Sequence, residues 1–239
     1  MKKFAFLSAI FLSAILSFAQ EKPLDTDCKA PCANHLEMVL VLDKSGSMSG
    51  LESDTIGGFN SMIDKQRELG LKTHVTTILF DTNFNVIHDR VDIKKIEKLT
   101  NKEYFASGNT ALLDAVGSAI NKIERVSDIY ARDNRVLFVI ITDGQENSSK
   151  EFSKSQIKQM ITAKQNKYDW EFIFLGANID AVSEAESIGI KGSNAVKYQN
   201  SSDGVRKNFE AAAEFSKDIM DNKKESSKWK EKVLEDKQR

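Results

Sequence analysis

The sequence predicts an α/β fold with a doubly wound, mostly parallel central sheet, one antiparallel edge strand, and helices on both faces. Two apolar runs, residues 38–42 and 136–141, have the composition of strands that are buried on both faces of a parallel sheet. Helical segments alternate with strands along the chain, which is typical of this class. Residues 81–83 alone join two other expected strands, and so short a link requires an antiparallel pair.

The expected elements follow one another in a regular order. After the strand at 38–42 we expect a helix over 51–69, in which Gly57 and Gly58 would allow a close approach to the sheet. The apolar pattern then predicts strands over 73–80 and 84–91, a short helix over 93–98 and a helix that begins near 112. The strand over 136–141 is followed by a helix near 154–165 and a strand over 171–175. A helix near 181–188, a short strand near 195–198 and a last helix from about 203 complete the order.

Four segments are expected along the chain. Residues 1–19 combine a basic start, an apolar stretch and small residues before Gln20, which predicts a cleaved secretory signal peptide; an uncleaved anchor is the alternative. Residues 20–34 form a leader, 35–222 the folded domain, and 223–239 a charged C-terminal extension. We expect this extension to be a solvated helix or a frayed tail, with a binding arm as the alternative. After cleavage we expect no stable membrane insertion and a secreted, periplasmic or cell-envelope location.

Both cysteines of the chain, Cys28 and Cys32, lie in the leader. In an oxidising compartment they would close a small local disulfide ring, and free thiols are the alternative. Their spacing fits neither the redox Cys-x-x-Cys motif nor half of a zinc site. So short a loop restrains little chain entropy, so we expect the disulfide to contribute little to stability.

The charge balance gives no support for nucleic acid or an anionic membrane as a partner. The chain has 34 basic and 35 acidic residues, well mixed, and a formal net charge of −1. Such a balance gives no electrostatic basis for binding nucleic acid or an anionic membrane. It does not define an oligomeric state.

Three oxygen ligands follow the first apolar strand. Asp43, Ser45 and Ser47 stand at alternate positions directly after it. In open α/β sheets, ligands bind at the carboxyl ends of the strands. Carboxylate and hydroxyl oxygens suit Mg²⁺, Mn²⁺ or Ca²⁺ and suit zinc or copper poorly. The pattern favours a metal site, although Asp and Ser also populate turns for local hydrogen-bonding reasons.

Two further segments carry oxygen ligands. Asp143 follows the strand at 136–141, and if both apolar strands lie centrally in one parallel sheet, Asp43 and Asp143 project from the same edge. Thr110 lies at or just before the start of a helix with apolar residues at helical spacing. Each also has a simpler interpretation, Thr110 as a helix N-cap and Asp143 as a turn acid before a glycine. The coincidence of all three segments favours the metal site.

Together these residues resemble the metal-ion-dependent adhesion site of the von Willebrand factor A (VWA) domain, a Rossmann-like fold also called the integrin I-like domain. The family joins Asp-x-Ser-x-Ser after the first strand, a Thr in a glycine-rich loop before a helix, and Thr-Asp-Gly after a later strand. The resemblance spans residues 36–222 approximately. This sequence supplies every ligand position in the family's order, with Asp43, Ser45, Ser47, Thr110 and Asp143.

The resemblance implies an exported, metal-dependent protein-binding module for adhesion or assembly, without enzymatic activity. The serine hydroxyls would bind the ion directly, the Asp and Thr ligands directly or through water, and an Asp or Glu carboxylate of a protein partner would take a remaining octahedral position. Mg²⁺ fits such a site because it keeps several waters and uses few carboxylates, with Mn²⁺ and Ca²⁺ as alternatives. The rim that would tune recognition comprises Lys44, Met48, Asn109 and Gln145.

A metal-assisted phosphoester hydrolase that uses the same ion is the alternative function. The sequence names no nucleophile for it and no general base beside Asp43. Ser45 stands where haloacid-dehalogenase-like phosphatases carry their second acid, and no glycine-rich nucleotide motif follows the first strand. We interpret His35, His74 and His88 as packing or surface residues, with His74 and His88 near each other across the antiparallel pair.

Overall fold

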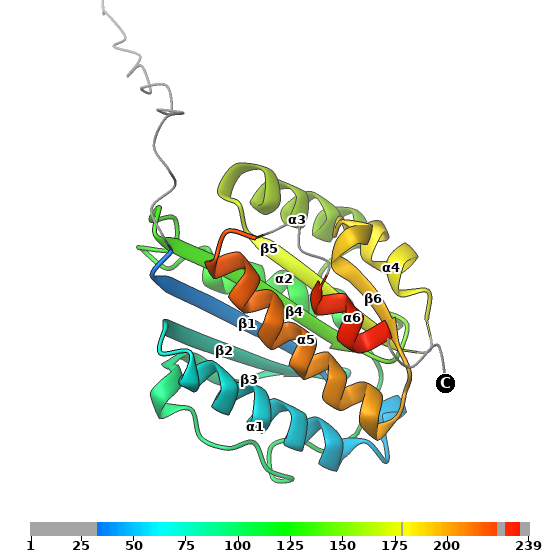
Figure 1. The fold of residues 1–239 in the computed structure, drawn as a ribbon. Coiled ribbons are helices and arrows are strands. Elements are labelled where there is room, and N and C mark those ends of the chain that lie inside the picture. Colours follow the sequence, from blue (N-terminus) through cyan, green and yellow to red (C-terminus); the bar gives the residue numbers. More distant parts are fainter. Residues whose placement is uncertain (1–32, 178, 224–227, 235–239) are drawn as a thin grey trace, which may run out of the picture. The chain divides into compact units, whose positions relative to one another are not determined.

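A computed structural model describes residues 33–177, 179–223 and 228–234 (Figure 1). The predicted signal peptide and the cysteine pair Cys28 and Cys32 lie outside the described residues. The strands are β1 (His35–Asp43), β2 (Lys72–Phe80), β3 (Phe84–Asp92), β4 (Asn134–Thr142), β5 (Glu171–Ala177) and β6 (Ala195–Tyr198). The helices are η1 (Gly46–Met48), α1 (Glu52–Glu68), η2 (Ile93–Lys95), α2 (Leu112–Ile123), α3 (Lys154–Tyr168), α4 (Ala181–Ser187), η3 (Gly192–Asn194), α5 (Ser202–Met220) and α6 (Lys228–Leu234).

The strands form one six-stranded sheet in the order β3-β2-β1-β4-β5-β6. Neighbouring strands are parallel except β2 and β3, which pair antiparallel and place β3 at an edge. The predicted fold class is therefore confirmed. Among the described residues, no helix combines the length and apolar composition needed to cross a membrane.

Strand β1 lies in the middle of the sheet, and its nine residues are all buried. Successive side chains of a strand point to opposite faces. Leu36, Met38 and Leu40 accordingly belong to the core beneath α1, α5 and α6, whereas Val39 and Val41 belong to the core beneath α2, α3 and α4. Figure 1 shows these two sets of helices on opposite faces of the sheet. The uninterrupted apolar run in the sequence reflects this double burial.

The chain beyond residue 222 differs from the expected solvated extension. In α6, Trp229 and Val233 are only 1% and 6% exposed. The Trp229 ring meets Phe215 of α5 edge to face, with 5.2 Å between ring centroids. The two apolar side chains lie one helical turn apart, which gives this lysine-rich helix a small apolar face. The packed surface therefore continues beyond residue 222.

The glycine pair in α1 serves contact between two helices. Gly57 is exposed, and a Cβ atom placed on it would meet no atom within 4 Å. Gly58 is buried, and a Cβ atom there would lie 2.4 Å from Cδ2 of Phe209 in α5. Gly58 thus allows close contact of α1 with α5, not with the sheet as the sequence suggested.

The different surroundings of Gly57 and Gly58 predict opposite effects on stability when each is replaced by alanine. Gly58→Ala should lower the free energy of unfolding by about 1–3 kcal/mol, because the added methyl group overpacks the contact with Phe209. Gly57→Ala should raise it by roughly 0.5–1 kcal/mol through helix propensity alone. Urea denaturation of both variants measures the two values. Equal destabilisation by both would contradict the close α1–α5 contact.

Candidate metal centre

Two neighbouring strands bring Asp43 and Asp143 to the same edge of the sheet. Asp43 is the last residue of β1, and Asp143 directly follows β4. Because β1 and β4 pair in parallel, with Leu42 opposite Ile141, the two acids leave the sheet side by side. Both are buried, with 1% and 2% of their surfaces exposed. Their proximity follows from the register of two adjacent strands.

Backbone contacts fasten the loops around these acids. The Gly46 N–H donates to the Gly108 carbonyl at 3.0 Å, which joins the loop after β1 to the loop before α2. The Ala111 N–H donates to the Asp81 carbonyl at 2.8 Å, which joins the loop before α2 to the end of β2. Gly108 has a φ of +67°, and a Cβ atom there would lie 2.6 Å from Thr82 Oγ1, so glycine is required.

Side-chain oxygens from two of these loops are in direct contact. Ser45 Oγ lies 3.0 Å from Ser47 Oγ, and Ser47 Oγ donates to Asp143 Oδ1 at 2.5 Å. Asp43 accepts hydrogen bonds from the Ser45 N–H at 2.7 Å and from the Thr142 hydroxyl at 2.6 Å. Ser45 is buried, but Ser47 is exposed. The cluster therefore opens to solvent on the Ser47 side.

Thr110 adds a hydroxyl from the third loop. A Cβ atom placed on Gly144 would lie 3.1 Å from Thr110 Oγ1 and 3.3 Å from Ser47 Oγ. The two hydroxyls thus flank one small space beside Asp143, which any side chain at position 144 would crowd. Thr110 does not act as the N-cap of α2, because that position is Ala111 and receives no side-chain cap.

The segment after β4 holds Thr110 in place. Asn147 Oδ1 accepts from the Thr110 N–H at 2.9 Å, and the Asn147 N–H donates to the Thr110 carbonyl at 3.1 Å. Glu146 Oε2 accepts from the Leu113 N–H in the first turn of α2 at 3.0 Å. These contacts satisfy free N–H groups at the helix start from another loop. They also couple the position of Thr110 to the segment that follows Asp143.

Burial dominates the electrostatics of the two acids. It raises the pKa of Asp43 to about 6, although hydrogen bonds from Thr142 and Ser45 oppose the shift and the charge of Asp143 adds to it. Burial also raises the pKa of Asp143, against the hydrogen bond from Ser47. No positively charged side chain of the described residues contributes to either shift. A bound cation would supply a positive charge.

The four expected rim residues occupy different environments. Asn109 and Gln145 are exposed beside the cluster. The Lys44 ammonium group instead forms an ion pair with Asp81. Met48 is 1% exposed, so its side chain lies beneath the loop and offers a partner almost no surface. Of the four residues, only Asn109 and Gln145 are exposed to solvent.

Three further residues support the two acids. The Tyr104 hydroxyl donates to the Asp43 carbonyl at 2.5 Å, and Asn200 Nδ2 donates to Asp143 Oδ2 at 3.2 Å. The third is Thr142, whose hydroxyl donates to Asp43 as described above. Thr142 had a sequence signal, because it directly precedes Asp143. Tyr104 and Asn200 had none, since only the fold brings them near.

The donor set suits a hard divalent cation. Carboxylate and hydroxyl oxygens meet here, and no sulfur or imidazole group takes part in the hydrogen bonds that join them. Such donors are those that Mg²⁺, Mn²⁺ and Ca²⁺ prefer. The space beside Gly144, flanked by two hydroxyls and Asp143, is consistent with an ion position. The candidate ligands remain Asp43, Ser45, Ser47, Thr110 and Asp143.

The sheet order and helix arrangement are those of the VWA domain, and solved structures of that class share this fold. A von Willebrand factor type A protein from Catenulispora acidiphila matches with a TM-score of 0.56 and 13% identity, over 78% of this chain and 43% of that chain. The pilus adhesin SpaC from Lactobacillus rhamnosus GG matches with a TM-score of 0.60 and 14% identity, over 79% and 30% of the two chains.

A third similar structure is proximal thread matrix protein 1 from the mussel byssus, with a TM-score of 0.52 and 16% identity over 79% of this chain and 46% of that chain. Another structure of that protein, described as having a zinc-occupied MIDAS motif, matches with a TM-score of 0.51. The chain thus spans less than half the length of these three neighbours. No protein-family model and no curated protein matches the sequence.

The raised pKa of Asp43 predicts a pH dependence for metal binding. Below about pH 6 this carboxyl is mostly protonated in the metal-free chain, so an ion must displace a proton to bind. The apparent affinity for Mg²⁺ should therefore fall as the pH decreases from 7 to 5, and binding should release protons near pH 6. Calorimetric titrations in buffers of different ionisation enthalpy measure both effects. An affinity that stays constant over this range would contradict the prediction.

Proposed function

We propose that this chain is an exported, metal-dependent protein-binding module in which a bound Mg²⁺ accepts a carboxylate from a partner. The supporting observation is the convergence of five oxygen-bearing side chains from three loops at the carboxyl edge of the sheet. Their proposed role is to hold the ion. They are Asp43, Ser45, Ser47, Thr110 and Asp143.

The balance of charged and neutral ligands favours Mg²⁺ over the alternatives Mn²⁺ and Ca²⁺. Only Asp43 and Asp143 among the proposed ligands carry charge, and Mg²⁺ is commonly held by one or two carboxylates together with waters. Ca²⁺ takes six to eight oxygens and often a bidentate carboxylate. Neutral hydroxyls donate little charge, so the bound ion would remain attractive to the carboxylate of an incoming Asp or Glu.

The surroundings of the cluster support access by a protein partner. Ser47 is exposed, and so are Asn109, which precedes Thr110, and Gln145, which is two residues after Asp143. A partner carboxylate would approach from this side, while Tyr104 and Thr142 hold Asp43 from within the fold. Amide side chains at the rim can form hydrogen bonds to groups that flank the carboxylate.

The solved neighbours support an extracellular binding role, in adhesion or assembly. They include a pilus adhesin and a byssus matrix protein. We extend this role to the present chain together with the predicted signal peptide, which would place it outside the cytoplasm as a secreted, periplasmic or envelope protein.

The alternative, a phosphoester hydrolase that uses the same ion, has less support. It requires a general base near the metal. All three histidines lie in the described part of the chain, and each has its contacts elsewhere. His35 lies against His74, and His88 lies 3.0 Å from the Thr77 hydroxyl. This arrangement favours the binding module.

The proposal predicts that metal and carboxylate bind cooperatively. A short peptide with one Asp or Glu should bind in Mg²⁺ and should lose at least about tenfold in affinity when EDTA is added or when its acid becomes an amide. Asp43→Ala should abolish the Mg²⁺ dependence, whereas Asp89→Ala should not, because Asp89 is an exposed acid of β3 paired with Lys122. Calorimetry with and without each component measures the coupling.

Two outcomes would contradict the binding module. Mg²⁺ that binds tightly but leaves every acidic peptide unaffected would indicate an ion that only stabilises the fold. Turnover of a generic phosphoester, lost in Asp43→Ala and retained in Asp89→Ala, would favour the hydrolase.

A further inference from the structure

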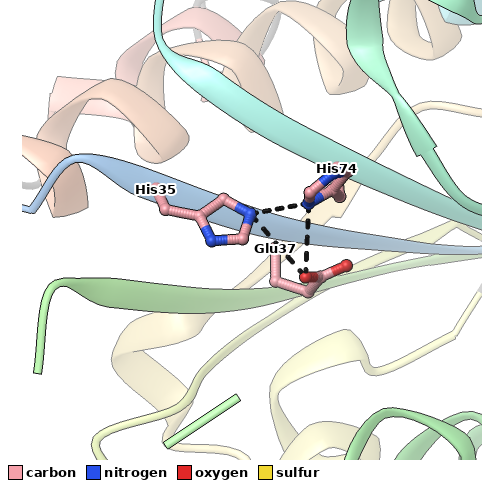
Figure 2. A group of neighbouring side chains, drawn as sticks. All are labelled: His35, Glu37 and His74. Atoms are coloured by element: carbon pink, nitrogen blue, oxygen red, sulfur yellow. Dashed lines mark hydrogen bonds and ion pairs between the residues drawn. The ribbon is translucent and has the colours of Figure 1, made fainter. Parts of the chain in front are cut away.

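A second group of metal-ligating side chains lies at the other end of β1. His35 and Glu37 are two residues apart on this strand and so share a face, and Glu37 stands in register with His74 of β2. Figure 2 shows the three side chains turned toward one another. Asp43 is eight positions beyond His35, which is about 26 Å along a strand. The group is therefore distinct from the Asp43 cluster.

The sequence did not indicate this contact. It suggested that His74 would lie near His88 across the antiparallel pair, but the register places His74 opposite Asp92 and His88 opposite Thr77. His74 instead contacts His35 of β1, its other neighbouring strand, with the rings edge to face and 4.8 Å between their centroids.

The hydrogen bonds of His35 fix which of its nitrogens carries a lone pair. Asn134 Nδ2 donates to the Asp128 carbonyl at 2.5 Å, so Asn134 Oδ1 faces His35 and can only accept. His35 Nδ1, at 2.8 Å, must therefore be the donor. The Nε2 atom then presents its lone pair toward His74. Metal-binding histidines are commonly oriented in this way, by a hydrogen bond at the other ring nitrogen.

Burial keeps His35 neutral. Its side chain is 3% exposed, and this desolvation lowers the pKa of the imidazole, although Asn134 and Glu37 oppose the shift. A neutral imidazole is the form that binds metals. His74 has 27% of its side chain exposed, so an ion from solvent can reach the group at this residue.

Arg90 orients the Glu37 side chain. The carboxylate is fully buried, and Arg90 Nε and Nη2 donate to it at 2.9–3.1 Å. Arg90 reaches it from β3 with a left-handed backbone, φ 48°, which is uncommon for a residue other than glycine. Each carboxylate oxygen has two lone-pair directions. Arg90 Nη2 takes one on Oε2, and Nε is shared between Oε1 and Oε2, so an ion on the side of the imidazoles would need only this shared contact to shift to Oε1.

From these contacts we propose that His35, Glu37 and His74 form a second metal site, which takes zinc or a similar borderline divalent ion rather than Mg²⁺. His35 Nε2 lies 2.8 Å from His74 Nδ1, and Glu37 Oε2 lies 3.9 and 4.0 Å from these atoms. Ligand atoms of a tetrahedral zinc are roughly 3.3 Å apart, given bonds of about 2.0–2.1 Å. Changes of roughly 0.5–0.7 Å in these separations would therefore match the tetrahedral spacing.

Binding of an ion at this site would require no net gain or loss of protons. In the metal-free chain His74 Nδ1 donates its proton to the lone pair of His35 Nε2. The ion would take the place of that proton, which would move to His74 Nε2, so no proton is gained or lost by the ring. Two nitrogens and one oxygen leave a fourth position for water, and the ion would join β1 to β2 at their amino-terminal ends.

Zinc titration of the full chain tests the site. The background should carry Asp43→Ala, Cys28→Ser and Cys32→Ser, so that neither the oxygen cluster nor the thiols compete. We expect one Zn²⁺ per chain, unaffected by excess Mg²⁺, and an affinity at least about tenfold weaker in His74→Gln. His88→Gln is the matched control, because it removes a half-buried histidine outside the group and should change nothing.

Cobalt substitution provides a readout that does not depend on the folding of His74→Gln. Co²⁺ in the same background should give the intense visible absorption of a four-coordinate site, and X-ray absorption at the zinc edge should show two imidazole ligands. Zinc that fails to saturate at one equivalent, or that binds His74→Gln and the background equally well, would overturn the proposal. Its failure would leave the Asp43 cluster untouched, because the two sites share no residue.

Discussion

The candidate metal centre is defined by one constraint, which is that two acidic side chains are buried beside each other. Asp43 and Asp143 end or follow neighbouring parallel strands, so the register that builds the sheet also forces their carboxylates together. Desolvation raises the pKa of both. Hydrogen bonds from hydroxyls and backbone N–H groups offset part of this cost but bring no positive charge. A divalent cation would offset this cost in a way that no neutral side chain can, because it would supply the opposite charge within the same few ångströms.

Hydrogen bonds within the chain hold the loops around the acids in place without any ion. Backbone hydrogen bonds join the loop after β1 to the loop before α2, and that loop to the end of β2. Glu146 and Asn147 hold the start of α2 and the backbone of Thr110. The oxygen atoms are therefore gathered before a ligand arrives, so less conformational entropy is lost on binding. The space beside Gly144 is maintained in the same way, by backbone and by the absence of a side chain.

Local pattern in the sequence predicted the strands and the residues at their ends. An apolar run fixes a buried strand, and the next polar residue then stands at the sheet edge, which is how Asp43 and Asp143 were found. Contacts between distant segments were not predictable in this way. Met48 has a position that the motif alone would place on the rim, but the turn of η1 directs it inward. The pairing of His35 with His74, and the docking of α6 through Trp229, depend on strand register and helix packing, which no local pattern contains.

If a metal-bound carboxylate anchors the partner, the ion itself cannot choose among partners, because any exposed Asp or Glu offers the same group. Discrimination must then come from the surface around it. The charge of Lys44 is already neutralised by Asp81, which leaves amides and an aromatic ring as the distinctive features. Phe105 is 52% exposed, and its ring lies 4.8 Å from the Lys44 ammonium group. Such a rim would distinguish partners by the shape and hydrogen-bonding groups next to their anchoring acid more than by their net charge. This agrees with the balanced charge of the whole chain.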